Sequence, residues 1–119
     1  MTLQFSHRQL SALGTSRFAE SFQLLLIRSF PDWSWLNSAA AFAELCKATD
    51  RAKAHGLGTE RQCASFVTAW VMAGADFDSL LPAPREALSS PELNANEKAD
   101  WLDEWLRLVL DALTLAALP

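Results

Sequence analysis

The chain has 119 residues, half of them hydrophobic, with a net charge of −4 and a pI near 5.0. A chain of this length buries roughly two-thirds of its unfolded surface, so a packed core is expected without a metal or a disulfide. The acidic balance argues against a nucleic-acid binder, which normally presents a basic face.

No targeting signal or membrane span is predicted. The first ten residues, MTLQFSHRQL, lack an apolar run after a basic start. The longest apolar runs, Leu24–Ile27 and Val109–Leu118, are too short or too interrupted to cross a bilayer. Cys46 and Cys63 lie on apolar helical stripes, which favours buried free thiols over a disulfide. We therefore expect a cytoplasmic protein.

The first thirty residues predict two helical segments. Ser6–Gln9 fits a capping box and begins a short helix that ends near Gly14, where the glycine either breaks the helix or bends it. Thr15 or Ser16 is expected to cap the next segment, because apolar residues then follow at helical spacing. Pro31 ends that segment, since the residue before a proline is pushed out of the α region.

The middle of the chain predicts a helical hairpin. Asp32 is the expected N-cap of a long helix over Trp33–His55, and Gly56 follows as a left-handed C′ residue. Thr59–Gln62 is a second capping box that begins the next helix. Gly74 ends that helix, so both helices carry clear start and stop signals.

The last third predicts one further long helix. Residues 75–93 are expected to form a loop with one short helix around Pro84–Leu88. Asn94 with Glu97 caps the last helix, which runs to about Leu118. Its expected apolar stripe is Trp101, Trp105, Leu108, Val109, Ala112 and Leu115. No segment alternates with a strand period, so residues 1–119 are predicted to form a single all-α domain, a compact bundle of about four to five helices.

No catalytic, cofactor-binding or metal-binding residues are predicted. His55 near Cys46 or Cys63 would resemble a Cys–His pair, but both cysteines face the expected core and no third orienting group is evident. The histidines and cysteines have no metal-ligand spacing. Asp76–Asp78 begins like a calcium loop but lacks its later ligands, so it is interpreted as a turn or a helix cap.

The five tryptophans divide into two groups. Three lie on helical stripes and are expected in the core: Trp70, Trp101 and Trp105. Trp33 and Trp35 are two residues apart, so on a helix both cannot face one core. Tryptophan is enriched at binding hot spots, and we predict a partner surface at Phe30, Trp33 and Trp35. The alternative is that both tryptophans pack under the preceding loop.

The last helix carries a second candidate surface. Residues 92–111 hold six acids and two bases, a net charge of −4. Asp100, Asp103 and Glu104 are predicted to contribute to partner binding. The alternative is a solvated helix face that binds nothing.

A set of caps and turns resembles a family of small helical proteins encoded beside type VI secretion effectors in Gram-negative bacteria. These segments are Phe30-Pro31, Arg51-Ala52, His55-Gly56-Leu57, Thr59-Glu60 and Gly74-Ala75-Asp76-Phe77. The likeness covers roughly residues 30–77, with His55 where the family usually has tyrosine. The resemblance implies a cytoplasmic adaptor or co-chaperone that helps to load or restrain an effector before export, and it implies no catalytic residues.

We therefore predict a non-enzymatic accessory protein. Its expected partner is another protein, an effector toxin or its chaperone, with a homodimer also open, and no cofactor, nucleic acid or membrane is expected. The alternative is an immunity protein that neutralises a toxic effector by direct binding through its acidic face. A small enzyme is the least favoured hypothesis and would require a cleft with convergent titratable groups.

Overall fold

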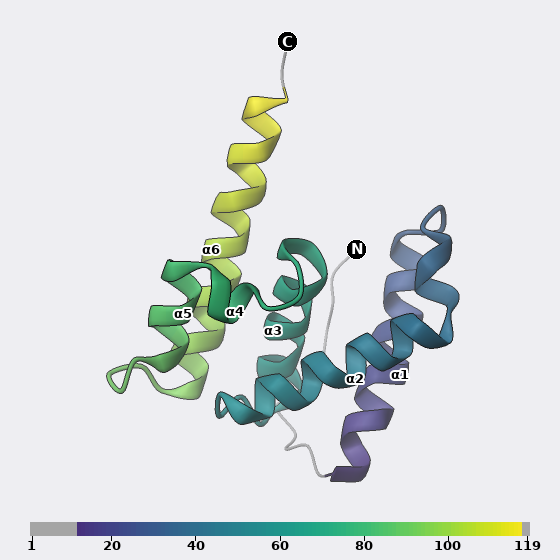
Figure 1. The fold of residues 1–119 in the computed structure, drawn as a ribbon, viewed down its shortest axis with the longest axis horizontal. Coiled ribbons are helices and arrows are strands. Elements are labelled where there is room, and N and C mark those ends of the chain that lie inside the picture. Colours follow the sequence, from purple (N-terminus) through teal and green to yellow (C-terminus); the bar gives the residue numbers. More distant parts are fainter. Residues whose placement is uncertain (1–11, 118–119) are drawn as a thin grey trace.

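The computed structural model describes residues 12–117, and within them the chain folds into helices joined by turns and short loops, with no strand (Figure 1). The long helices are α1 (Ala12–Ser29), α2 (Ala39–Ala54), α3 (Glu60–Ala73) and α6 (Ala95–Ala116). A 3₁₀ turn, η1 (Ser34–Asn37), and two short helices, α4 (Phe77–Leu80) and α5 (Pro82–Ser89), connect them. The predicted all-α class is confirmed.

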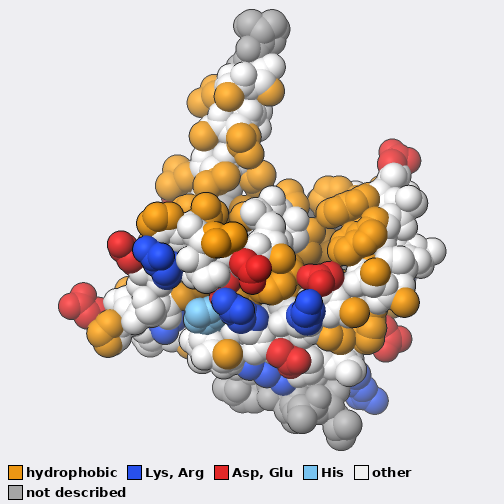
Figure 2. Space-filling model, viewed as in Figure 1, with side chains coloured by type: hydrophobic (Ala, Val, Ile, Leu, Met, Phe, Trp, Pro, Cys, Tyr) orange, Lys and Arg blue, Asp and Glu red, His pale blue; other side chains and the backbone are white. Residues whose placement is uncertain are grey.

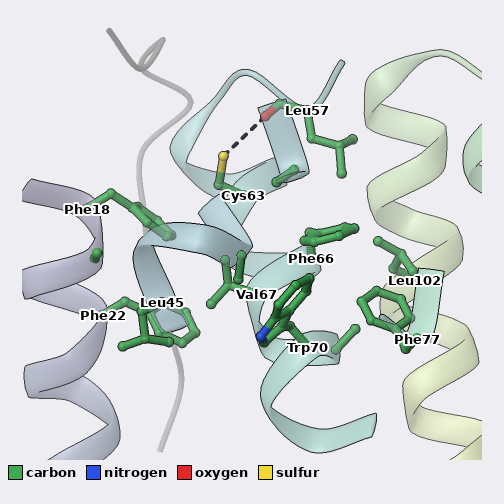
Figure 3. Close-up of a cluster of buried hydrophobic side chains, with 14 of the residues drawn as sticks. Phe18, Phe22, Leu45, Leu57, Cys63, Phe66, Val67, Trp70, Phe77 and Leu102 are labelled. Atoms are coloured by element: carbon green, nitrogen blue, oxygen red, sulfur yellow. Dashed lines mark hydrogen bonds between the residues drawn. The ribbon is translucent and has the colours of Figure 1, made fainter. Parts of the chain in front are cut away.

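Helix α3 is the centre of the packing. It contacts α2 on one side and α6 on the other, while α1 packs on α2 and the α4–α5 pair packs beside α6 (Figure 1). Figure 3 shows the side chains that fill these contacts, with Phe18, Phe22 and Leu45 on the side of α1 and α2 and with Phe77 and Leu102 on the side of α6. Phe66 and Trp70 of α3 lie between the two groups.

Local capping signals determine the ends of α2 and α3. The amide of Leu57 donates to Ala52 O and that of Gly56 donates to Lys53 O, and these are the two hydrogen bonds of a Schellman motif. Gly56 has a φ of +85°, the left-handed conformation that this motif requires. The predicted capping box of Thr59 and Gln62 is present, with both reciprocal bonds at 3.2 Å.

Two other predicted signals at helix ends are also confirmed. Gly74, at φ +108°, follows the last residue of α3. The capping box of Asn94 and Glu97 begins α6.

Several predicted boundaries are wrong. Asp32 does not cap a helix over Trp33–His55, because η1 intervenes and Ser38 accepts from the amide of Ala41 to cap α2 instead. Thr15 and Ser16 are not caps either: both lie inside α1, which runs through Gly14 without a break, and the Thr15 hydroxyl accepts a hydrogen bond from Lys53 Nζ.

Two further corrections concern the last third. The segment predicted to be a loop with one short helix contains both α4 and α5. The expected apolar stripe of α6 does not all reach the core, since Leu108, Ala112 and Leu115 are exposed and Trp101 and Trp105 are half-buried. Trp70 is buried as predicted. The Ser6–Gln9 capping box and Leu118 lie outside the described residues.

Candidate functional site

Three exposed aromatic rings gather at the turn between α1 and α2, and we name them the aromatic corner: Phe30, Trp33 and Trp35. Trp33 and Trp35 stack at 5.7 Å between ring centroids, and Phe30 meets Trp33 edge-on at 6.4 Å. Each residue is 40–42% exposed. The two tryptophans do not point to different sides, because Trp33 precedes η1 with non-helical backbone angles. All three residues predicted for this surface therefore lie together on it.

A network of hydrogen bonds holds the corner in place. Gln23 Nε2 of α1 donates to Leu36 O at 2.8 Å, within the turn that carries Trp35, and to Ser38 O at 3.1 Å, directly after that turn. The Ser38 hydroxyl donates to Trp35 O at 2.6 Å. Leu36 is fully buried and anchors η1 in the core. The aromatic rings are thus presented on a rigid support, which lowers the entropy cost of binding through them.

An apolar groove begins at Phe30 and runs between the ends of α1 and α3 and the middle of α6. Its volume is about 300 Å³. It is lined by Leu26, Ser29, Phe30, Thr68, Val71, Met72, Leu106 and Leu110. None of these eight described residues carries a charge. The corner and the groove therefore form one continuous surface that suits an apolar partner.

The predicted acidic residues already have partners within the chain. Asp100 pairs with Arg61 of α3 at 2.6 Å, and Glu104 pairs with Arg107 one turn later in α6. The hydrogen bond from Arg107 lowers the pKa of the Glu104 carboxyl. Burial against α3 raises the pKa of the Asp103 carboxyl, and a hydrogen bond with Ser65 opposes that shift. The acidic face is thus partly neutralised by its own chain.

The two halves of the predicted partner surface lie at opposite ends of α3. Asp100 contacts Arg61 in its first turn, whereas Phe30 shares the groove with Met72 in its last turn. Eleven residues of helix separate Arg61 from Met72, a rise of about 16 Å. A partner that covered both ends would have to lie along the whole of α3.

A buried ionic cluster, which the sequence did not reveal, joins the end of α2 to α4. Asp78 Oδ2 accepts a hydrogen bond from Arg51 Nε at 2.7 Å. The same oxygen lies 2.7 Å from His55 Nε2. The Asp78 side chain is fully buried, and its Oδ1 has no partner among the described residues. The only available signal was the i, i+4 spacing of Arg51 and His55, because the carboxylate that they share is 23 residues further on.

This cluster, which we name the α2–α4 junction (Arg51, His55 and Asp78), is continuous with the core. The His55 ring lies 5.5 Å from Phe66, and Phe66 lies 5.1 Å from Phe77, the residue before Asp78. Phe77 stacks on Trp105 of α6 at 5.9 Å. The junction therefore holds α4 in the position from which Phe77 connects α3 to α6.

The cysteines are free thiols. Burial raises the pKa of the Cys63 thiol from its ordinary 9.0 to about 11, and burial with the Asp50 charge also raises that of Cys46. Cys63 Sγ donates to Leu57 O, in the loop between α2 and α3 (Figure 3). Both thiols are thus predominantly protonated near neutral pH, the less nucleophilic form.

Comparisons with protein-family models, with curated proteins and with solved structures find no match for this chain. Within residues 12–117 no three His, Cys, Asp or Glu side chains come close enough together to hold a metal ion. No helix in the same range combines the length and the hydropathy that a membrane span requires. The surface features of the described residues are therefore what a functional proposal must rest on.

Proposed function

We propose that this protein acts by binding another protein through the aromatic corner, as an adaptor or co-chaperone for a secreted effector. The observation that carries the proposal is the rigid, exposed stack of Trp33 and Trp35 with Phe30 beside it. Tryptophan is the residue type most enriched at binding hot spots, and a pre-ordered ring loses little entropy on binding. The assignment to type VI secretion rests on the sequence resemblance, and a role before export puts the protein in the cytoplasm.

The size of the exposed apolar area supports this choice. An aromatic side chain has roughly 150–250 Å² of surface, so the three corner rings at 40–42% exposure offer about 200–300 Å². The adjoining groove and Met72, which is 43% exposed, extend that area. The largest apolar patch of a typical monomer is about 300–600 Å² and is often functional.

The immunity alternative depends on the acidic face of α6. Its exposed carboxylates are partly satisfied by Arg61 and Arg107, which reduces the field available to attract a basic toxin. The corner rings, in contrast, keep 40–42% of their surface exposed, and this apolar surface needs no opposite charge to be available to a partner. The adaptor proposal is therefore the stronger of the two.

Co-expression with the product of the neighbouring effector gene tests the proposal. We expect the two proteins to co-purify, and we expect the double variant Trp33→Ala/Trp35→Ala to lose that association while remaining folded by circular dichroism. Leu80→Ala is the matched control, because Leu80 is an exposed apolar residue on α4, away from the corner. A protein that emerges alone, with no secretion component bound, contradicts the proposal.

A second assay separates the adaptor from the immunity protein. An immunity protein rescues cells that express the isolated toxin domain, whereas an adaptor changes only the stability or the secretion of the effector. We expect no rescue. Rescue that depends on Asp100 and Glu104, but not on Trp33 and Trp35, would transfer the function to the acidic face.

A further inference from the structure

The second half of α6 is an apolar helix that leaves the body of the protein. We name residues 108–116 the α6 arm. Leu108, Leu113 and Leu115 are 54%, 61% and 69% exposed, and Asp111 is the arm's one charged residue. Figure 1 shows the end of α6 extending beyond the other helices, and Figure 2 shows hydrophobic side chains along it. A helix with apolar residues on all sides is normally covered by protein.

The face of α6 that lines the apolar groove continues along the arm. Leu106 and Leu110 form one wall of the groove. Leu113 follows Leu110 by three residues and Leu106 by seven, so all three lie on the same side of the helix. The chain therefore carries both an uncharged groove and, in direct continuation, an uncharged ridge.

We propose that the α6 arm docks in the apolar groove of a second copy of this chain, giving a two-fold dimer in which the two α6 helices run antiparallel. A two-fold contact uses the same surface on both subunits, so that surface must be complementary to itself. A groove and an adjoining ridge on one helix meet this condition. The arm of each copy would contact Met72, Val71 and Phe30 of the other.

The charge distribution favours a second copy in this orientation. The first half of α6 carries Glu97, Asp100, Asp103 and Glu104 against the single base Lys98, whereas the one acid of the arm, Asp111, pairs with Arg107. An antiparallel pair keeps the two acidic halves of α6 apart, and a parallel pair would set acid against acid. Two chains of net charge −4 approach most easily along the apolar face of the arm, where the charge of Asp111 is balanced by Arg107.

The contact area sets the expected strength. Nine residues of helix are about 14 Å long and about 10 Å across, so half the surface of the arm is about 220 Å². Two arms and two matching grooves would bury about 900 Å², below the 1,200–2,000 Å² of a standard interface. A weak, concentration-dependent dimer is therefore expected rather than an obligate one.

This dimer goes beyond the proposed function, although it would cover the groove and Phe30, which adjoin the two tryptophans of the aromatic corner. Trp33 and Trp35 lie outside the groove lining, so they stay open for another partner. The arm variant Leu113→Glu should remove the dimer and the corner variant Trp33→Ala/Trp35→Ala should remove effector binding, each leaving the other association intact.

Analytical ultracentrifugation of the full chain, from about 1 µM to about 500 µM, tests the dimer. We expect a shift from the monomer mass of 13.1 kDa toward twice that value. Leu113→Glu on the arm and Met72→Glu in the groove should each hold the chain as a monomer throughout. Leu80→Glu is the matched control on exposed α4 and should dimerise as the wild type does.

Orientation is tested by mixing Leu113→Cys chains with Met72→Cys chains under mild oxidation. We expect a covalent dimer between the two variants, and far less from either alone. A wild type that stays monomeric at about 500 µM overturns the proposal and would assign the arm to a helix of another protein. Dimerisation of Leu113→Glu at wild-type strength also overturns it.

Discussion

The α2–α4 junction and the α6 arm differ in what their side chains contact: the junction binds a buried carboxylate within the chain, and the arm exposes its apolar side chains. At the junction, Arg51 and His55 meet the buried carboxylate of Asp78, and the His55 ring packs against Phe66 of the core. On the arm, apolar side chains extend into solvent with nothing described against them. The contacts of the junction are made within the chain, so a contribution to folding stability is enough to explain them. The exposed apolar side chains of the arm and the aromatic corner add little to folding stability, so contact with another molecule is the better explanation for them.

The largest difference in stability should come from the core beside the junction. Phe77→Ala removes a ring that contacts both Phe66 and Trp105 and is 2% exposed. Truncation of a buried phenylalanine costs about 3–5 kcal/mol, partly as a cavity. Urea unfolding followed by circular dichroism measures the loss. A cost below about 1 kcal/mol would mean that α4 is not part of the folded core.

The ionic cluster should come next. Asp78→Asn keeps the shape of the side chain but removes the charge that Arg51 and His55 share, and we expect a loss of about 2 kcal/mol. Partial exposure of Arg51 keeps the value below that of a fully buried pair. Asp76→Asn, two residues earlier and exposed, is the control and should change the free energy of unfolding by less than about 0.5 kcal/mol. Equal effects of the two variants would contradict a structural role for the cluster.

These two regions also differ in how far the sequence predicts them. Caps and stops depend on residues within four positions of each other, so Gly56, the Thr59 and Asn94 capping boxes and Gly74 were all predicted correctly. The Asp32 cap was wrong because a competing local arrangement, η1 followed by the Ser38 cap, uses the same polar residue types.

The rest could not be predicted from local patterns. The contact of Asp78 with Arg51 joins residues 27 positions apart, and no local pattern specifies it. The apolar stripe of α6 predicts an amphipathic helix but not where the neighbouring helices end, so Leu108 and Leu115 were placed in a core that stops short of them. The corner residues Phe30, Trp33 and Trp35 were predicted to form a surface, and the structure adds that they stack on one another. Whether that surface and the acidic residues of α6 bind a partner stays a prediction.

The buried Cys63 thiol gives a prediction about alkaline pH. Its folded pKa of about 11 lies above the value of 9.0 in an exposed chain, so between pH 9 and pH 11 the unfolded chain loses the proton that the folded chain keeps. The free energy of unfolding should therefore fall over that range, by at most about 2 kcal/mol, while below pH 9 the contribution is complete. Cys63→Ala should lack this part of the decline. Parallel pH profiles of the two proteins would contradict the shift.

The Thr59 cap should have a smaller effect. Thr59→Ala removes the acceptor for the amide of Gln62 at the start of α3, and loss of such a cap costs about 1 kcal/mol. Thr59→Ser keeps the hydroxyl and should recover most of that stability in the same urea experiment. Failure of the serine variant to recover it would show that the buried methyl group, not the cap, matters.

The arm should have the smallest effect on folding. Leu113→Ser, measured at a concentration low enough to keep the chain monomeric, should change the free energy of unfolding by less than about 0.5 kcal/mol, because Leu113 is mostly exposed. Thermal unfolding at two concentrations provides the check, since a dimer makes the wild-type Tm depend on concentration and the variant should not. A loss above about 2 kcal/mol in the monomer would place the arm in the folded core.

The most direct test of the central claim, that function resides in the exposed aromatic corner and not in the junction, is the affinity for the neighbouring effector gene's product by calorimetric titration. We predict that Trp33→Ala/Trp35→Ala weakens binding by at least about tenfold, as truncation of a hot spot does. Asp78→Asn, studied where it is fully folded, should stay within about threefold of the wild type. Unchanged affinity in the corner variant, or a larger loss in the junction variant, would contradict the account.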